Sequence, residues 1–227
     1  MVRAIIFDFD GLILETEEPT YQSWAEIFQS FGLSLPFSTW MANVGTTQGD
    51  FDPQRELERL VNGSLDWEQI ETRRREIEDR LIEAQPALPG ASQYLHDARR
   101  LGYKVGIASN SPMEWVKKYM TRLSLMDCVD RFSTSDFVRH IKPDPEIYLN
   151  ALQALDVSAS EAIALEDSLI GVRAARRAGI FCVAVPNPLI RGATFDEANF
   201  HIQSLEEMPL ESLLLRILPL KTQEAAS

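Results

Sequence analysis

Cysteine is scarce in this chain of 227 residues, which contains only Cys128 and Cys182. Each lies alone in or near an apolar segment, which favours buried, reduced thiols and excludes a disulfide framework. The three histidines, His96, His140 and His201, show no spacing typical of metal ligands. We therefore expect neither cysteine nor histidine to carry the chemistry of this protein.

Positive charge and long apolar runs are also lacking. Lysine and arginine number 22 against 34 acidic residues, so the net charge is -12 and we expect no nucleic-acid partner and no membrane partner. No apolar run is long enough to span a bilayer. Asp8 and Asp10 interrupt the apolar run near the start, so we expect no signal peptide and a cytoplasmic protein. We expect a monomer and leave an oligomer open.

The most informative segment is Ala4–Gly11, where a short apolar run ends in Asp8 and Asp10, with Gly11 directly behind them. Such a run predicts a buried strand. Strand alternation places both carboxylates on one side at the carboxyl end, where open parallel sheets bind ligands. Two ionised carboxylates this close repel each other unless a cation lies between them. The plainer alternative is a solvated acidic turn that caps a helix.

The chain shows two kinds of pattern, and the first is helical. Between about residues 16 and 85, apolar residues recur at helical spacing, and we find no convincing strand there. The clearest example is the series Tyr21, Trp24, Ile27, Phe28 and Phe31, which stops at Gly32. We therefore predict an α-helical unit in this part of the chain.

From Leu88 onward, strands and helices alternate, which predicts a parallel sheet with right-handed crossovers. The first strand must join this sheet, because a single strand has no independent stability. The predicted fold class is therefore α/β, a doubly wound parallel-sheet core with an inserted α-helical cap domain. Its core comprises residues 1–15 and 87–227, and its cap residues 16–86.

Polar residues follow two more of the predicted strands. Ser109 and Asn110 follow the strand at 103–108 and precede Ser111, which we interpret as the start of a capping box with Pro112 at the first helical position. A hydroxyl, an amide and a helix N-terminus together suit an anion. If these residues stood alone, they would equally fit an ordinary turn.

A lysine and a second acid pair complete the set. Lys142 precedes Pro143 in a rigid proline turn, which holds it in place, although a solvated loop lysine is the simpler reading. Glu166 and Asp167 end another buried strand, where Asp167 or Ser168 could instead cap the next helix. Acids beside a lysine, a serine and a helix N-terminus suit Mg²⁺ together with a phosphate.

These segments resemble the four motifs of the haloacid dehalogenase superfamily, in the same order over nearly the whole chain. The matching segments are Phe7–Glu17 (FDFDGLILETE), Ala108–Ser111 (ASNS), Lys142–Pro145 (KPDP) and Leu165–Val172 (LEDSLIGV). They look most like the branch with a helical cap after the first motif, the β-phosphoglucomutase-like phosphatases. The resemblance implies a doubly wound core, a cap, and Mg²⁺-dependent phosphoryl transfer through an aspartyl phosphate.

The resemblance also implies residue roles. Asp8 would be the nucleophile, and Asp10 the general acid and then the base. The phosphate would be bound by Ser109, Asn110 and Lys142, and we add Gly11 beside them. Mg²⁺ would be held by the Asp8 carboxylate, the Asp10 carbonyl, Glu166 and Asp167. The expected function is a phosphatase acting on a small phosphorylated metabolite, a sugar phosphate or similar.

Several alternatives are weighed against this function. A phosphosugar mutase of the same branch would carry a histidine near position 20, where this chain has Thr20, which favours a phosphatase. A dehalogenase has no aspartate at the position of Asp10. A receiver-like regulatory domain keeps its acids in another order. A catalytically inactive relative that only binds phosphate is a further non-enzyme option.

Two further segments of the predicted cap could contact the substrate. Gly45, Thr46 and Thr47 lie where specificity residues of the cap often occur. One of Arg73, Arg74 and Arg75 could bind a second anionic group of the substrate, but neighbouring glutamates offer local pairing instead.

Overall fold

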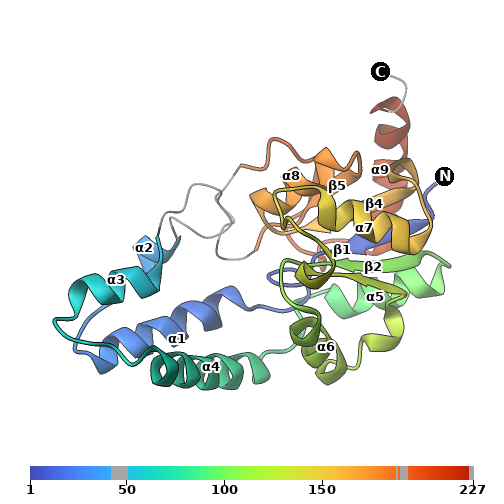
Figure 1. Cartoon of the computed structure of the whole chain (residues 1–227). Helices are drawn as coiled ribbons and strands as arrows, with labels where there is room; N and C mark the ends of the chain where they lie inside the picture. Colours follow the sequence, from blue (N-terminus) through green and yellow to red (C-terminus); the bar gives the residue numbers. More distant parts are fainter. Residues whose placement is uncertain (42–50, 188, 190–193, 225–227) are drawn as a thin grey trace. The chain divides into compact units, whose positions relative to one another are not determined.

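The computed structural model describes residues 1–41, 51–187, 189 and 194–224 (Figure 1). The predicted specificity segment Gly45–Thr47 lies outside the described residues. The chain divides into two compact units, one formed by Met1–Leu14 with Pro86–Ser227 and the other by Glu15–Gln85. The second unit is therefore an insertion that follows the first strand.

The first unit is built on a six-stranded sheet in the order β3-β2-β1-β4-β5-β6, in which every neighbouring pair is parallel. The direction of winding reverses between β1 and β4, and open parallel sheets bind ligands at the carboxyl ends beside such a reversal. The strands are β1 (Ala4–Phe7), β2 (Lys104–Ala108), β3 (Arg131–Ser133), β4 (Ala162–Glu166), β5 (Phe181–Ala184) and β6 (Phe200–His201).

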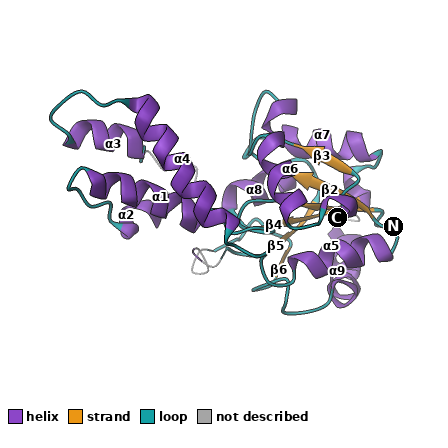
Figure 2. Ribbon diagram, turned by 90° about the horizontal axis from the view of Figure 1, so that it is seen from below, coloured by secondary structure: helices purple, strands orange, loops and turns teal. Residues whose placement is uncertain are grey.

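Helices cover both faces of this sheet (Figure 2). The α5 helix packs with α9 on one face, and α7 packs with α8 on the other. Every residue of β1 and β4 is buried as a result, which explains why these strands are continuous apolar runs rather than alternating ones. The helices of this unit are α5 (Ala91–Arg100), α6 (Met113–Arg122), α7 (Glu146–Leu155), α8 (Leu169–Arg177) and α9 (Leu210–Glu224), and its 3-10 helices are η1 (Met126–Cys128), η2 (Ser135–Phe137) and η3 (Ala159–Glu161).

The second unit is helical over its described residues, as the sequence predicted. Its α1 and α4 helices pack against each other around an apolar core that includes Trp24, Phe28 and Leu57. The helices are α1 (Glu17–Ser30), α2 (Phe37–Met41), α3 (Pro53–Leu60) and α4 (Trp67–Glu83).

The arginine run on α4 shows the local pairing that the sequence offered. Arg74 pairs with Glu71 at 3.2 Å and with the buried Glu78 at 3.0 Å, and its guanidinium lies over the ring of Trp24. The hydroxyl of Thr20 donates a hydrogen bond of 2.8 Å to Glu78. The guanidinium of Arg74 is therefore engaged in contacts within the helical unit. In the part of the chain that the structure describes, no helix is long and apolar enough to cross a membrane.

Candidate active site

Three buried carboxylates meet at the carboxyl ends of β1 and β4, on the two sides of the winding reversal. Asp8 directly follows β1, Glu166 is the last residue of β4, and Asp167 comes next. Their exposed fractions are 6%, 0% and 5%. Each offers an oxygen within 4.8 Å of the others. The two acidic segments, far apart in sequence, are thus brought together by adjacent parallel strands.

Lys142 lies between these acids. Its Nζ is 2.8 Å from Asp8 Oδ1 and 2.7 Å from Glu166 Oε1, and it donates to the Ala108 carbonyl at 2.8 Å. An ammonium group has three hydrogens, so these partners use all of its donors. In this structure Lys142 is the counter-ion of the acids, and binding a phosphate would require it to share or exchange one of these bonds.

The cluster carries an excess of negative charge away from water. Burial and the charge of Asp8 raise the pKa of Glu166 to about 8, although Lys142 acts in the opposite direction. Burial disfavours the charged form of Lys142, but attraction to Asp8 and Glu166 outweighs burial and raises the pKa of the lysine. Lys142 therefore stays charged, and a further cation would favour an ionised Glu166.

Glu166 has two close neighbours that the sequence reasoning missed. The Tyr148 hydroxyl on α7 donates a short hydrogen bond to Glu166 Oε1. Gly171 on α8 passes so close that a Cβ there would lie 1.8 Å from Glu166 Oε2. A glycine in the first turn of the helix directly behind an acid pair was the signal that could have found it. Tyr148 had no such signal, because it looks like one more core residue of a helix.

Asp8 has two unequal oxygens. Oδ1 accepts from Lys142 and also from the Phe9 N–H at 2.7 Å. The structure records no hydrogen bond to Asp8 Oδ2 from any described residue. The carboxylate is thus held by one oxygen and has the other available for a ligand or for reaction.

Gly11 has a steric part in the site, and its predicted contact with a phosphate stays a prediction. Its φ is +77°, and a Cβ would lie 2.0 Å from Asp167 Oδ2. Its N–H donates to the Leu14 carbonyl at 2.8 Å, so that group already has a partner. Asn187 closes the same corner: its N–H donates to the Asp167 carbonyl and its side-chain amide to the Gly11 carbonyl, both at 3.4 Å. Sequence reasoning missed Asn187, although a polar residue shortly after a buried strand was the same signal that identified Asn110.

Asp10 points to a different set of partners from Asp8. Its Oδ2 accepts from Ser109 Oγ at 3.1 Å and from Ser111 Oγ at 2.6 Å, and its Oδ1 accepts from Trp115 Nε1 at 3.0 Å. The Asp10 side chain is therefore not one of the three clustered carboxylates. Its predicted contact with a metal through the carbonyl stays a prediction.

The capping box predicted at Ser111 is wrong, because Asp10 takes the serine hydroxyl. The α6 helix starts at Met113, Pro112 takes the N-cap position, and no side chain within that segment caps the helix. The Ser111 hydroxyl donates to Asp10 instead, and the Met113 N–H donates to Asp136 Oδ2 at 2.5 Å. A tertiary partner has replaced the local one that the sequence offered.

Asn110 supports the lysine segment. Its Oδ1 accepts from the Lys142 N–H at 2.9 Å, and its Nδ2 donates to the Lys142 carbonyl at 3.4 Å. This reciprocal pair ties the end of β2 to the segment that carries the lysine. The side chain of Asn110 is thus engaged in positioning Lys142, while Ser109 is fully buried beside Asp10.

The acidic cluster fits a magnesium ion. Mg²⁺ prefers oxygen ligands, and Asp8, Glu166 and Asp167 supply only carboxylate oxygens. Glu166 Oε2 is buried and has no hydrogen-bond partner, which is costly for a carboxylate unless a cation binds nearby. A hard divalent cation would suit these oxygen ligands and would also give Glu166 Oε2 a partner.

The family comparison agrees with this arrangement. Haloacid dehalogenase-like hydrolases match residues 5–185, which include both acid pairs, the lysine and the inserted helical unit. The chain belongs to this family. The resemblance inferred from the four motifs is thereby confirmed, and so is the fold class.

Individual relatives match this hydrolase over most of its length. YhcW of Bacillus subtilis (strain 168) is 41% identical over 214 residues, 94% of this chain and 97% of that protein. Validoxylamine A 7'-phosphate phosphatase of Streptomyces hygroscopicus subsp. limoneus is 29% identical, covering 82% and 86% of the two chains. The crystal structure of CbbY from Rhodobacter sphaeroides in complex with phosphate superposes with a TM-score of 0.75 at 29% identity, covering 91% and 96%.

Proposed function

We propose that this hydrolase is a Mg²⁺-dependent phosphatase that cleaves the phosphate ester of a small phosphorylated metabolite. The observation that carries the proposal is the Asp8 carboxylate, held through Oδ1 by Lys142 and Phe9 and clustered with two further buried acids. The relatives support the substrate class, since one is named for validoxylamine A 7'-phosphate and another was crystallised in complex with phosphate.

Asp8 would act as the nucleophile. Its Oδ2 forms a bond to the phosphorus, the bond between phosphorus and the ester oxygen breaks, and an aspartyl phosphate results. A carboxylate is a weak nucleophile toward an anionic phosphate, so its charge must be partly neutralised, which Lys142 does at 2.8 Å. The fixed ammonium also faces the charge that develops on the transferred group.

Asp10 would move the protons. It gives a proton to the departing ester oxygen, and then takes one from the water that attacks the phosphorus of the aspartyl phosphate. That second step releases inorganic phosphate and restores Asp8. Ser109, beside Asp10, would donate a hydrogen bond from its hydroxyl to the phosphate.

Asp8, Glu166 and Asp167 would hold the magnesium ion together with the Asp10 carbonyl. When bound, Mg²⁺ supplies positive charge that offsets the repulsion between the carboxylates and the phosphate. The inserted helical unit would act as a cap that excludes water and contacts the rest of the substrate.

The direct test is release of phosphate from p-nitrophenyl phosphate, with and without Mg²⁺, by the wild type and by Asp8→Asn. We expect Mg²⁺-dependent release by the wild type and a loss of roughly 10³-fold or more in the variant. Asp127→Asn is the matched control, because Asp127 is exposed on η1. This 3-10 helix precedes β3 and so lies at the amino ends of the strands, away from the carboxyl ends that carry the acids. Equal rates for the wild type and Asp8→Asn would refute the enzymatic proposal.

A second assay separates a phosphatase from a phosphosugar mutase. Thr20 bonds to Glu78 inside the helical unit and offers no imidazole, which supports the phosphatase. With β-glucose 1-phosphate and its bisphosphate, we expect free phosphate to form faster than glucose 6-phosphate. The reverse order would make the protein a mutase.

A further inference from the structure

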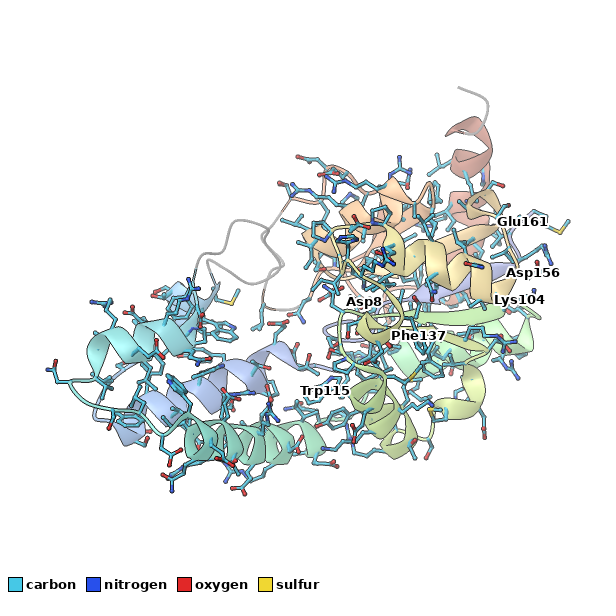
Figure 3. All side chains as sticks on the ribbon, in the orientation of Figure 1. Asp8, Lys104, Trp115, Phe137, Asp156 and Glu161 are labelled. Atoms are coloured by element: carbon cyan, nitrogen blue, oxygen red, sulfur yellow. The ribbon has the colours of Figure 1, made fainter. Side chains whose placement is uncertain are left out.

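Asp10 is held by three donors from one short segment, and one of them has no place in the four motifs. Ser109 and Ser111 bond to Oδ2, while the indole N–H of Trp115 bonds to Oδ1 at 3.0 Å. Figure 3 shows Trp115 and Asp8 at the same end of the unit, opposite Lys104 and Glu161. The inference that follows rests on the proposed function.

The three donors are not equivalent once a phosphate arrives. A serine hydroxyl has one proton to donate, and the proton of Ser109 is directed to Asp10 in this structure. If Ser109 donates to the substrate phosphate, that proton is no longer available to Asp10. An indole N–H can only donate, so Trp115 can stay on Oδ1 throughout.

Trp115 stands on a rigid support. It lies in the first turn of α6, and its ring packs edge-on against the fully buried ring of Tyr119, with centroids 4.8 Å apart at 76°. The start of α6 is tied to η2, because Asp136 accepts from the Met113 N–H at 2.5 Å and from the Thr134 hydroxyl at 3.1 Å. A partner held on such an element can fix the position of a carboxylate more closely than a loop residue could.

We propose that Trp115 is a positioning residue for Asp10. Its N–H holds Oδ1 in place, so that Oδ2 is the oxygen that gives the proton to the departing ester oxygen after Ser109 turns to the phosphate. Trp115 does not touch the reacting atoms. Its contribution is to keep the Asp10 carboxyl group aimed at the ester oxygen.

The test is Trp115→Phe, which keeps an aromatic ring for Tyr119 and removes the N–H. We expect kcat/KM for an alkyl phosphate such as a hexose 6-phosphate to fall roughly tenfold, because an alkoxide is a poor leaving group and needs a well-aimed acid. For p-nitrophenyl phosphate the fall should be less than about twofold, since its leaving group needs little protonation. In an Asp10→Asn background, Trp115→Phe should change neither value.

The matched control is Trp67→Phe, which removes an indole N–H bond of 2.9 Å to Glu58 in the helical unit. It should leave both values unchanged. An equal fall for the two substrates, no fall for either, or a further loss in the Asp10→Asn background would overturn the role of Trp115. If Trp115→Phe does not fold, Trp115→Leu, which also has no hydrogen-bond donor, carries the same expectation. Retained activity in Asp8→Asn would refute the proposed function instead, so the two failures are distinguishable.

Discussion

At the scale of single residues, the site depends on two glycines as much as on its acids and its lysine. Gly11 leaves room for Asp167, and Gly171 leaves room for Glu166, where a Cβ would lie 2.0 Å and 1.8 Å from a carboxylate oxygen. Both acids are buried, so they have no solvent-filled space into which they could retreat. The acidic cluster therefore requires glycine at these two positions.

Gly171→Ala tests this requirement. The added methyl group must displace the Glu166 carboxylate or α8, and we expect kcat to fall at least tenfold and stability to fall by about 1–3 kcal/mol. Gly179→Ala is the control on the other end of α8: its φ of +77° makes alanine cost about 1–2 kcal/mol, but its nearest non-local neighbour is the Ala159 methyl at 3.6 Å. Urea unfolding and phosphate release measure both variants. Unchanged activity in Gly171→Ala would show that the glycine is dispensable.

At the scale of elements, the sequence predicted those whose pattern is local. The strands β1, β2 and β4 are apolar runs bounded by turn residues, and the sequence predicted a strand at each of these places. The β3 strand was missed because Arg131–Ser133 is short and includes an exposed arginine. The start of α6 was misjudged because Ser111 bonds to Asp10, a partner about a hundred positions away that no local pattern could reveal.

The residues of the site also divide into those that a local sequence pattern marks and those that only a long-range contact identifies. Asp8 and Asp167 directly follow apolar strands and Glu166 ends one, so their position at the carboxyl ends of a parallel sheet could be predicted from the sequence. The pairing of β1 with β4, which brings them together, comes from the structure. Tyr148 and Trp115 are aromatic residues on helices, and the sequence offers no way to tell them from core residues. What identifies them is the carboxylate that each contacts in three dimensions.

The start of β4 carries a pH-dependent prediction. The Ser158 N–H, Arg3 and the Ser158 hydroxyl stabilise the charged carboxylate and lower the pKa of Glu161 to about 2 from 4.5. The unfolded chain binds this proton more readily, so the contribution is present above pH 4.5 and is lost as the pH falls towards 2. Glu161→Gln should therefore lower the urea midpoint at pH 6, and its difference from the wild type should shrink by pH 2.5. A difference of the same size at both pH values would contradict this assignment.

At the scale of the whole molecule, the chain crosses between its two units only at residues 14–15 and 85–86. The helical unit has its own apolar core, with Leu57 and Phe28 fully buried, and the sheet unit has another. We therefore expect each unit to keep its fold when the core of the other is weakened. A Trp115→Phe background separates the probes, since Cys128 and Cys182 lie in the sheet unit and the remaining tryptophans, Trp24, Trp40 and Trp67, lie in the helical one.

Leu57→Ala tests this independence. Removing a fully buried leucine should destabilise the helical unit by about 2–5 kcal/mol. In the Trp115→Phe background, the urea midpoint followed by tryptophan fluorescence should fall, while the midpoint followed by labelling of the two cysteines should stay within error. A parallel fall in both would mean that the two units unfold as one.

The central claim is that Asp8 takes the phosphoryl group onto its own carboxylate. The most direct measurement is a single turnover with a sugar phosphate, quenched in acid and analysed by mass spectrometry of the peptides. We predict a phosphoryl group on the peptide that contains Asp8 in the wild type, and none on that peptide in Asp8→Asn. A wild-type turnover that releases phosphate while the Asp8 peptide is never phosphorylated would contradict the account.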